Sequence, residues 1–108
     1  MRAPVLAVVA GALALVAAAP SAVAAPTLDV VCQSRGSQFS CFTDRGGGSP
    51  MTVTWTRNGV PVPAWDGMGF VLGLCTPGEV VAVAATVTDP TGSATDGETF
   101  PCNTGPWP

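Results

Sequence analysis

Residues 51–59 read MTVTWTRNG and contain the clearest structural signal in the sequence. Over the first six positions apolar residues alternate with threonines, which is the period of a β-strand with one buried face and one face in water. The next pair, Asn58-Gly59, is well able to supply the two positive φ angles of a type I′ hairpin turn. The segment therefore predicts a strand over residues 51–57 that places Trp55 in a core and ends in a hairpin.

Further strand signals run along the rest of the chain. Residues 81–87 place valine and alanine on one alternating face, and the Asp-Pro-Thr-Gly sequence at 89–92 is one that a type I turn favours. Because Pro61 and Pro63 cannot donate to a ladder, the return from the first hairpin is expected to be an edge strand. The other strands are expected over residues 28–34, 38–44, 60–65, 70–75 and 93–102. Seven strands, with no helical pattern after residue 25, predict a small all-β antiparallel sandwich.

The N-terminal segment has the pattern of a secretory signal. A positive residue, Arg2, precedes an apolar run over residues 5–19, and an Ala-Val-Ala cleavage sequence follows at 22–24. The run of about 15 residues is shorter than the roughly 20 that a membrane span needs. We expect residues 1–24 to be removed, and residues 25–108 to form one secreted domain with no membrane anchor.

Four cysteines allow three disulfide pairings, and a turn favours one of them. A two-residue type II′ loop at Gly36-Ser37 would place the first two cysteines opposite each other on neighbouring strands. The remaining two would then lie at strand ends on one pole of the domain. The expected bridges are Cys32–Cys41 and Cys75–Cys102. Bridges of this kind suit a small domain outside the cytoplasm.

The composition of residues 25–108 excludes several classes of function. Three arginines stand against seven acidic residues, so nucleic acid and anionic membranes are poor partners. This part of the sequence has no histidine, lysine or tyrosine, which removes the usual catalytic triads, Schiff-base lysines and histidine metal sites. The carboxylates left as acid, base or calcium ligands are Asp66, Glu79, Asp89, Asp96 and Glu98. Their spacing matches no EF-hand loop, and we expect no enzyme, no cofactor and no metal site.

Residues 28–102 resemble an immunoglobulin-like domain. Cys41 is followed fourteen residues later by Trp55 and then by a strand and turn that end at Gly92, and the Trp-Thr-Arg-Asn-Gly segment is similar to the third strand of such domains. More narrowly, the layout resembles small actinobacterial secreted proteins with an immunoglobulin-like domain. Two positions depart from the family, because Ala85 replaces the second core cysteine and Val83 the corner tyrosine. The resemblance implies a sandwich with a binding surface and transfers no catalytic residue.

The favoured function is a secreted, non-catalytic domain that binds an extracellular macromolecule or a component of the cell envelope. Trp65, which follows the edge strand, and Arg57, at the hairpin tip, are the candidate contact residues, since aromatic residues and arginine are enriched in binding interfaces. An alternative is a small inhibitor of a secreted hydrolase, either a protease or an amylase. A third hypothesis, a carrier of an apolar small molecule, would require a cavity inside the sandwich.

Overall fold

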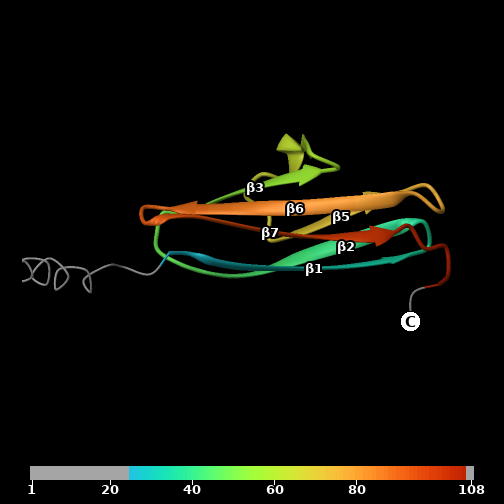
Figure 1. Cartoon of the computed structure of the whole chain (residues 1–108), viewed down its shortest axis with the longest axis horizontal. Coiled ribbons are helices and arrows are strands. Elements are labelled where there is room, and N and C mark those ends of the chain that lie inside the picture. The colour runs from blue at the N-terminus through green and yellow to red at the C-terminus, as the bar shows by residue number, and fades with distance from the viewer. Residues whose placement is uncertain (1–24, 107–108) are drawn as a thin grey trace, which may run out of the picture.

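Seven strands form two antiparallel sheets in the computed structural model, which describes residues 25–106. The strands are β1 (Thr27–Arg35), β2 (Gln38–Gly46), β3 (Thr52–Arg57), β4 (Val60–Pro61), β5 (Phe70–Leu74), β6 (Val80–Asp89) and β7 (Gly92–Pro101). One sheet has the order β1-β2-β5 and the other the order β4-β3-β6-β7. The sheets lie face to face as two layers (Figure 1). The predicted all-β sandwich of about seven strands is confirmed.

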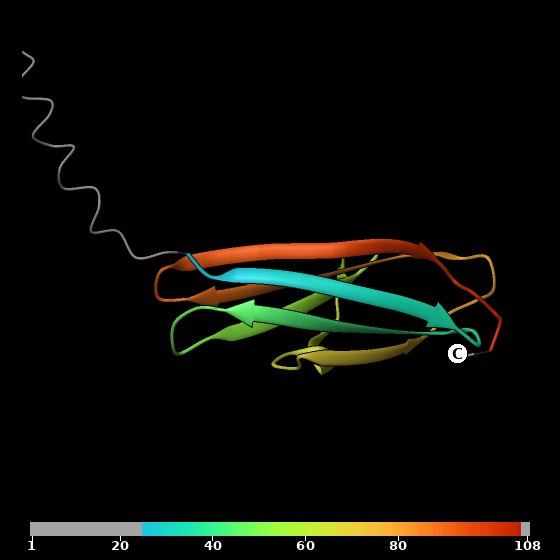
Figure 2. The ribbon, with the colours of Figure 1, turned by 90° about the horizontal axis from the view of Figure 1, so that it is seen from below.

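The arrangement of the strands gives the three-stranded sheet two different margins. Figure 2 shows β5 as the outermost strand on one side, with β2 and then β1 following across the sheet. On the opposite side β1 lies next to β7, although these two strands belong to different sheets. Different strands therefore border the two long sides of the sandwich.

The core is built from the alternating faces that the sequence predicts. On β6 the inward residues are Val81, Val83, Ala85 and Val87, all of them buried. Trp55 on β3 is 1 % exposed, and its indole Nε1 donates a 2.9 Å hydrogen bond to the carbonyl of Met68. The prediction that Trp55 lies in the core is confirmed.

The loop at Gly36-Ser37 differs from its predicted type. Both residues have positive φ, 58° and 60°, which is the pattern of a type I′ turn, whereas a type II′ turn has positive φ only at its first central residue. The type II′ prediction is therefore wrong. The loop length is nevertheless two residues, so the register is unchanged and Cys32 lies opposite Cys41.

Both predicted disulfides are present. Cys32–Cys41 joins two neighbouring strands of one sheet, with Cα atoms 4.1 Å apart. Cys75–Cys102 joins the end of β5 to the end of β7 and so connects the two sheets. No cysteine of the described part is left as a free thiol.

The return from the Asn58-Gly59 turn is shorter than predicted. Strand pairing covers only Val60–Pro61, and a 3-10 turn over Pro63–Trp65 replaces the rest of the expected strand. Val62 still donates a backbone hydrogen bond to the carbonyl of Trp55, and the strand ends there because Pro63 begins the 3-10 turn, where its fixed φ is favourable. The edge position of this segment is confirmed.

Two expectations concern the membrane and the N-terminus. The predicted signal peptide, residues 1–24, lies outside the described residues. Within residues 25–106, no helix has the length and apolar character needed to cross a bilayer. The two disulfides are compatible with an oxidising environment outside the cytoplasm.

Candidate interaction surface

The outer face of the three-stranded sheet exposes large apolar side chains. The five residues that we call the apolar face are Val31 on β1, Phe42 on β2 and Phe70, Leu72 and Leu74 on β5. Their exposed fractions rise from 40 % for Val31 to 71 % for Leu74. Contiguous apolar surface is uncommon on soluble domains and marks interaction sites more often than single exposed residues do.

Strand register brings the members of the apolar face together. Val31 pairs with Phe42, and Phe42 pairs with Phe70, so these three residues form one row across the sheet. Leu72 and Leu74 continue the face along β5, since alternate residues of a strand point to the same side. A surface hollow beside β5 is lined by Gln38, Leu72, Gly73 and Leu74.

The outer face of the four-stranded sheet has a different chemistry. Thr54 pairs with Thr86, and Thr86 pairs with Thr95, so hydroxyl groups line a row across this sheet. The hydroxyl oxygens of Thr86 and Thr95 lie 2.8 Å apart, and Thr88 and Ser93 form a similar contact at 2.9 Å. Of the two outer faces, only that of β1, β2 and β5 carries a row of large apolar side chains in the described part of the chain.

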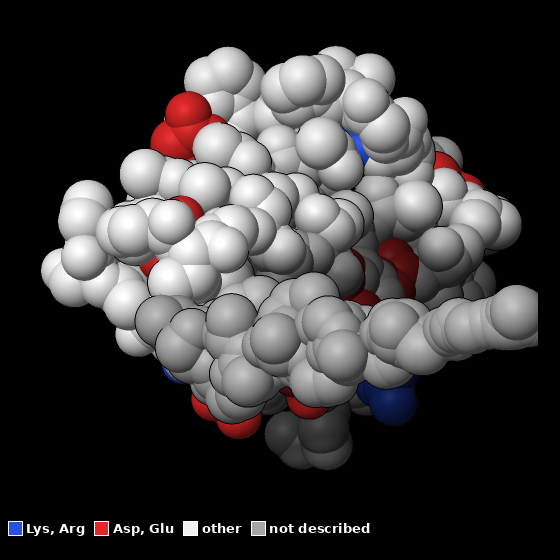
Figure 3. Space-filling model, turned by 60° about the vertical axis from the view of Figure 1, so that its left-hand side comes forward, with Lys and Arg blue, Asp and Glu red and all other residues white. Residues whose placement is uncertain are grey.

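Charged groups lie around the apolar face and not within it. At one end Asp29 pairs with Asp44, and at the other Arg35 pairs with Gln38, which in turn pairs with Leu74. On the part of the surface visible in Figure 3, uncharged residues cover most of the area, and acidic and basic groups are scattered. The face seen in this view is therefore mainly uncharged.

Trp65, a predicted contact residue, packs against the core. It lies in the 3-10 turn, and its ring meets those of Trp55 and Phe39 edge-on, each at a centroid distance of 6.2 Å. It is partly buried among the residues that cover the hydrophobic cluster. Trp65 therefore has a structural role at the open side of the sandwich, and its role as a contact residue stays a prediction.

Arg57, the other predicted contact residue, is also held by the fold. Its Nη2 donates a 2.8 Å hydrogen bond to the carbonyl of Leu74 and lies 3.5 Å from a carboxylate oxygen of Glu79. Its guanidinium carbon lies 5.0 Å from the centre of the Phe39 ring, a cation–π distance. Phe39 thus brings Arg57 and Trp65 together, although they stand at opposite ends of one short hairpin.

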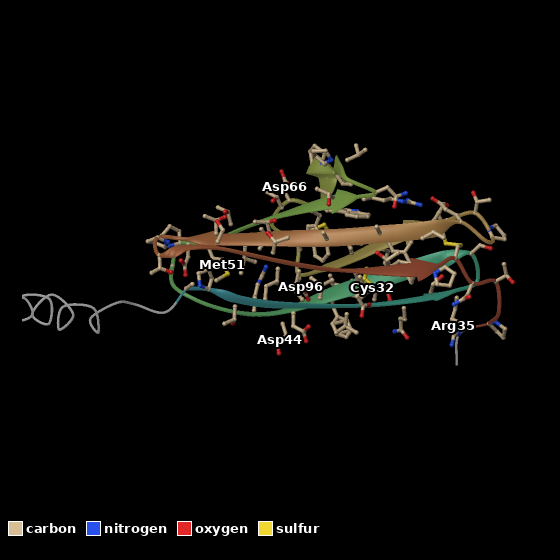
Figure 4. All side chains as sticks on the ribbon, in the orientation of Figure 1. Cys32, Arg35, Asp44, Met51, Asp66 and Asp96 are labelled. Atoms are coloured by element: carbon tan, nitrogen blue, oxygen red, sulfur yellow. A yellow bond between two sulfur atoms is a disulfide. The ribbon has the colours of Figure 1, made fainter. Side chains whose placement is uncertain are left out.

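Two of the candidate acid or base carboxylates cover the edge of β1. Asp96 on β7 accepts a 2.8 Å hydrogen bond from the backbone N–H of Val30, and Glu98 accepts one of 2.6 Å from that of Cys32. Figure 4 shows Asp96 in this region, between β7 and β1, while Asp66 lies apart from it near the hairpin of β3. These carboxylates hold the backbone and do not converge on a shared site.

Asp89 closes the turn between β6 and β7. One of its oxygens accepts hydrogen bonds from the hydroxyl and the backbone N–H of Thr91, and the other accepts one from the N–H of Gly48. These bonds, the Thr91 hydroxyl first, lower the pKa of the Asp89 carboxyl below its usual value of 3.8. Within the described residues, no group of three or more Cys, Asp or Glu side chains is placed to hold a metal ion.

The sequence contains a signal for the apolar face that the alternation of polar and apolar residues does not detect. Residues 70–74, Phe-Val-Leu-Gly-Leu, have apolar side chains at both odd and even positions of the strand. Such a strand is apolar on both faces, whereas a two-layer sandwich of this size buries only one of them. Alternation of polar and apolar residues identifies strands that have one polar face. It does not indicate what covers the second face of a strand that is apolar on both.

Comparison of the chain with protein-family models, curated proteins and solved structures gives no match. No function is therefore transferred to this chain from a relative.

Proposed function

We propose that this chain is a secreted, non-catalytic immunoglobulin-like module that binds an extracellular macromolecule or a component of the cell envelope through the apolar face. The observation that carries the proposal is the exposure of five large apolar side chains on one outer face. A small domain gains nothing in its own stability from leaving Leu72 and Leu74 in water, whereas a partner that covers them removes apolar area from solvent.

The arrangement of the polar side chains supports binding without turnover. Asp96 and Glu98 are occupied by backbone N–H groups of β1, and Asp89 by its own turn. An acid and a base for hydrolysis would need to converge on one cleft. These carboxylates instead stabilise the sandwich.

The inhibitor hypothesis receives less support from the geometry. It relied on tryptophan and arginine side chains presented together on a hairpin. Trp65 packs on Phe39 and Trp55, and Arg57 is bonded to Leu74 and Glu79. Inserting either side chain into the cleft of a hydrolase would require these contacts to break, so the apolar face is the better candidate.

Capture from extracellular material tests the proposal. The exported, oxidised protein is immobilised, partners from culture supernatant and cell-envelope fractions are identified by mass spectrometry, and their Kd is measured. Phe42→Ser is expected to weaken binding about thirtyfold or more, the size of effect typical of a central interface residue. Thr54→Ser, on the outer face of the other sheet, is the matched control. Equal binding by Phe42→Ser and the parent would place the site elsewhere.

A further inference from the structure

The backbone of β5 has an open side. Thr43 donates to the carbonyl of Gly69, and Cys75 donates to that of Ser37, so the odd-numbered residues of this segment bond to β2. In an antiparallel ladder the intervening residues direct their N–H and C=O groups the other way. Phe70, Leu72 and Leu74 therefore present their backbone groups to the outer margin of the sheet.

Within residues 25–106, these outward groups have one partner. Arg57 bonds the carbonyl of Leu74, while the N–H and C=O groups of Phe70 and Leu72 have no hydrogen-bond partner in this part of the chain. Figure 2 shows β5 at the margin of the sheet, with no strand beyond it. An unpaired edge of this kind is a template for another extended backbone.

The other strand edges are protected. The edge of β1 is covered by Asp96 and Glu98, and β7 lies against it. The edge strand β4 has only two residues, one of them Pro61. Short strands, prolines and inward carboxylates are common means of preventing edge pairing. The five residues of β5 include no charged residue and no proline, and Arg57 reaches this edge at the carbonyl of Leu74.

We propose that two copies of this chain pair antiparallel through their β5 strands and form a continuous six-stranded sheet. The sequence of β5 is self-complementary in this arrangement. Pairing centred on Leu72 sets Leu72 opposite the same residue of the second copy and Phe70 opposite Leu74, so that apolar side chains meet apolar side chains across the seam. Residues 69–74 contain no ionisable group, and Arg57, which reaches the edge at Leu74, lies 3.5 Å from the carboxylate of Glu79, so no unpaired acidic group of these residues opposes contact at the seam.

The pairing would also enlarge the apolar face. Phe70 of one copy adjoins Leu74 of the other, so the row formed by Val31, Phe42 and Phe70 in each copy continues across the seam. A closed two-fold contact uses the same surface twice and ends growth at two copies, because each copy has one open β5 edge. The dimer thus presents one double-sized apolar surface.

Leu72→Pro is the decisive variant. Since the N–H of Leu72 points away from β2, proline removes no hydrogen bond within the sheet, yet it removes a central donor of the pairing. Sedimentation of the exported, oxidised chain should give twice the mass of one chain as concentration rises, and Leu72→Pro should give the mass of one chain throughout. A parent protein that stays monomeric, or a Leu72→Pro variant that still dimerises, would overturn the proposal.

Amide hydrogen exchange tests the parent protein directly, even where the proline variant does not fold. The amides of Phe70 and Leu72 should exchange more slowly as protein concentration rises, and rates that do not change with concentration contradict the pairing. Phe42→Ser separates the two proposals, because it should remain dimeric while losing the partner. Loss of the dimer in this variant would mean that the outer face, and not the strand edge, joins the copies.

Discussion

At one margin of the three-stranded sheet, carboxylates from β7 cover the backbone of β1, whereas at the other margin the backbone of β5 is left open. Asp96 and Glu98 accept hydrogen bonds from alternate N–H groups of β1. Asn103 continues this cover, since its N–H and side-chain amide bond to Ser34. The β1 margin is thus sealed with polar groups from the chain's own C-terminal third.

At the β5 margin, aromatic rings and one arginine side chain cover the core. Trp65 and Arg57 both contact Phe39, which lies over Gly73, and they close the space between the sheets, while their one hydrogen bond to the strand is that of Arg57 to the carbonyl of Leu74. A Cβ atom at Gly73 would clash with the Phe39 ring, so the absence of a side chain there is what allows this packing. The difference shows that covering the apolar core and hydrogen-bonding the backbone of an edge strand are separate requirements. At β5 only the covering of the core is complete.

The largest effect is expected at the residue that supports the open margin. Trp55→Ala removes a buried ring that contacts Trp65 and bonds the carbonyl of Met68, next to the start of β5. We expect a loss of about 3 to 5 kcal/mol in the free energy of unfolding, which is a large share of the stability of a small domain. Chemical denaturation of the oxidised protein measures it. A change below about 1 kcal/mol would show that the indole does not hold this margin.

Local patterns in the sequence predict the strands and both disulfides, because each depends on alternation or on the length of a turn. Even the Gly36-Ser37 loop gave the correct register with the wrong turn type, since both types contain two residues. The covering of the β1 edge could not be predicted from the sequence, because Val30 and Asp96 are 66 residues apart and meet only once the two sheets have packed. The grouping of Arg57 with Trp65 around Phe39 likewise depends on tertiary packing.

An intermediate effect is expected where the sealed margin is opened. Asp96→Ala leaves the N–H of Val30 without its acceptor, and we expect a loss of about 1.5 to 3 kcal/mol in the free energy of unfolding, the range of hydrogen bonds to charged groups. Asp29→Ala is the matched control, because this carboxylate is exposed on β1 itself and should change stability by less than about 0.5 kcal/mol. Faster exchange of the Val30 amide in Asp96→Ala, with unchanged exchange in β5, would localise the effect. Equal losses in the two variants would mean that the cover over β1 contributes nothing.

The smallest effect is a pH dependence at the pole next to the sealed margin. Hydrogen bonds from Thr91 and Gly48 lower the pKa of Asp89 in the folded protein below 3.8. A carboxyl with a depressed folded pKa stabilises the fold above its unfolded pKa, and this contribution is lost as pH falls from about 4 through the folded value. Asp89→Asn keeps an oxygen acceptor but has no charge to titrate. Its stability deficit relative to the parent should therefore be constant from pH 7 to about 5 and shrink at lower pH, as measured by urea unfolding at each pH. The β5 margin is held by aromatic rings, a disulfide and an arginine, so the protection of its amides from exchange should depend less on acid than that of the Gly48 amide. A stability deficit of Asp89→Asn that does not change with pH would exclude the charge of Asp89 as the cause.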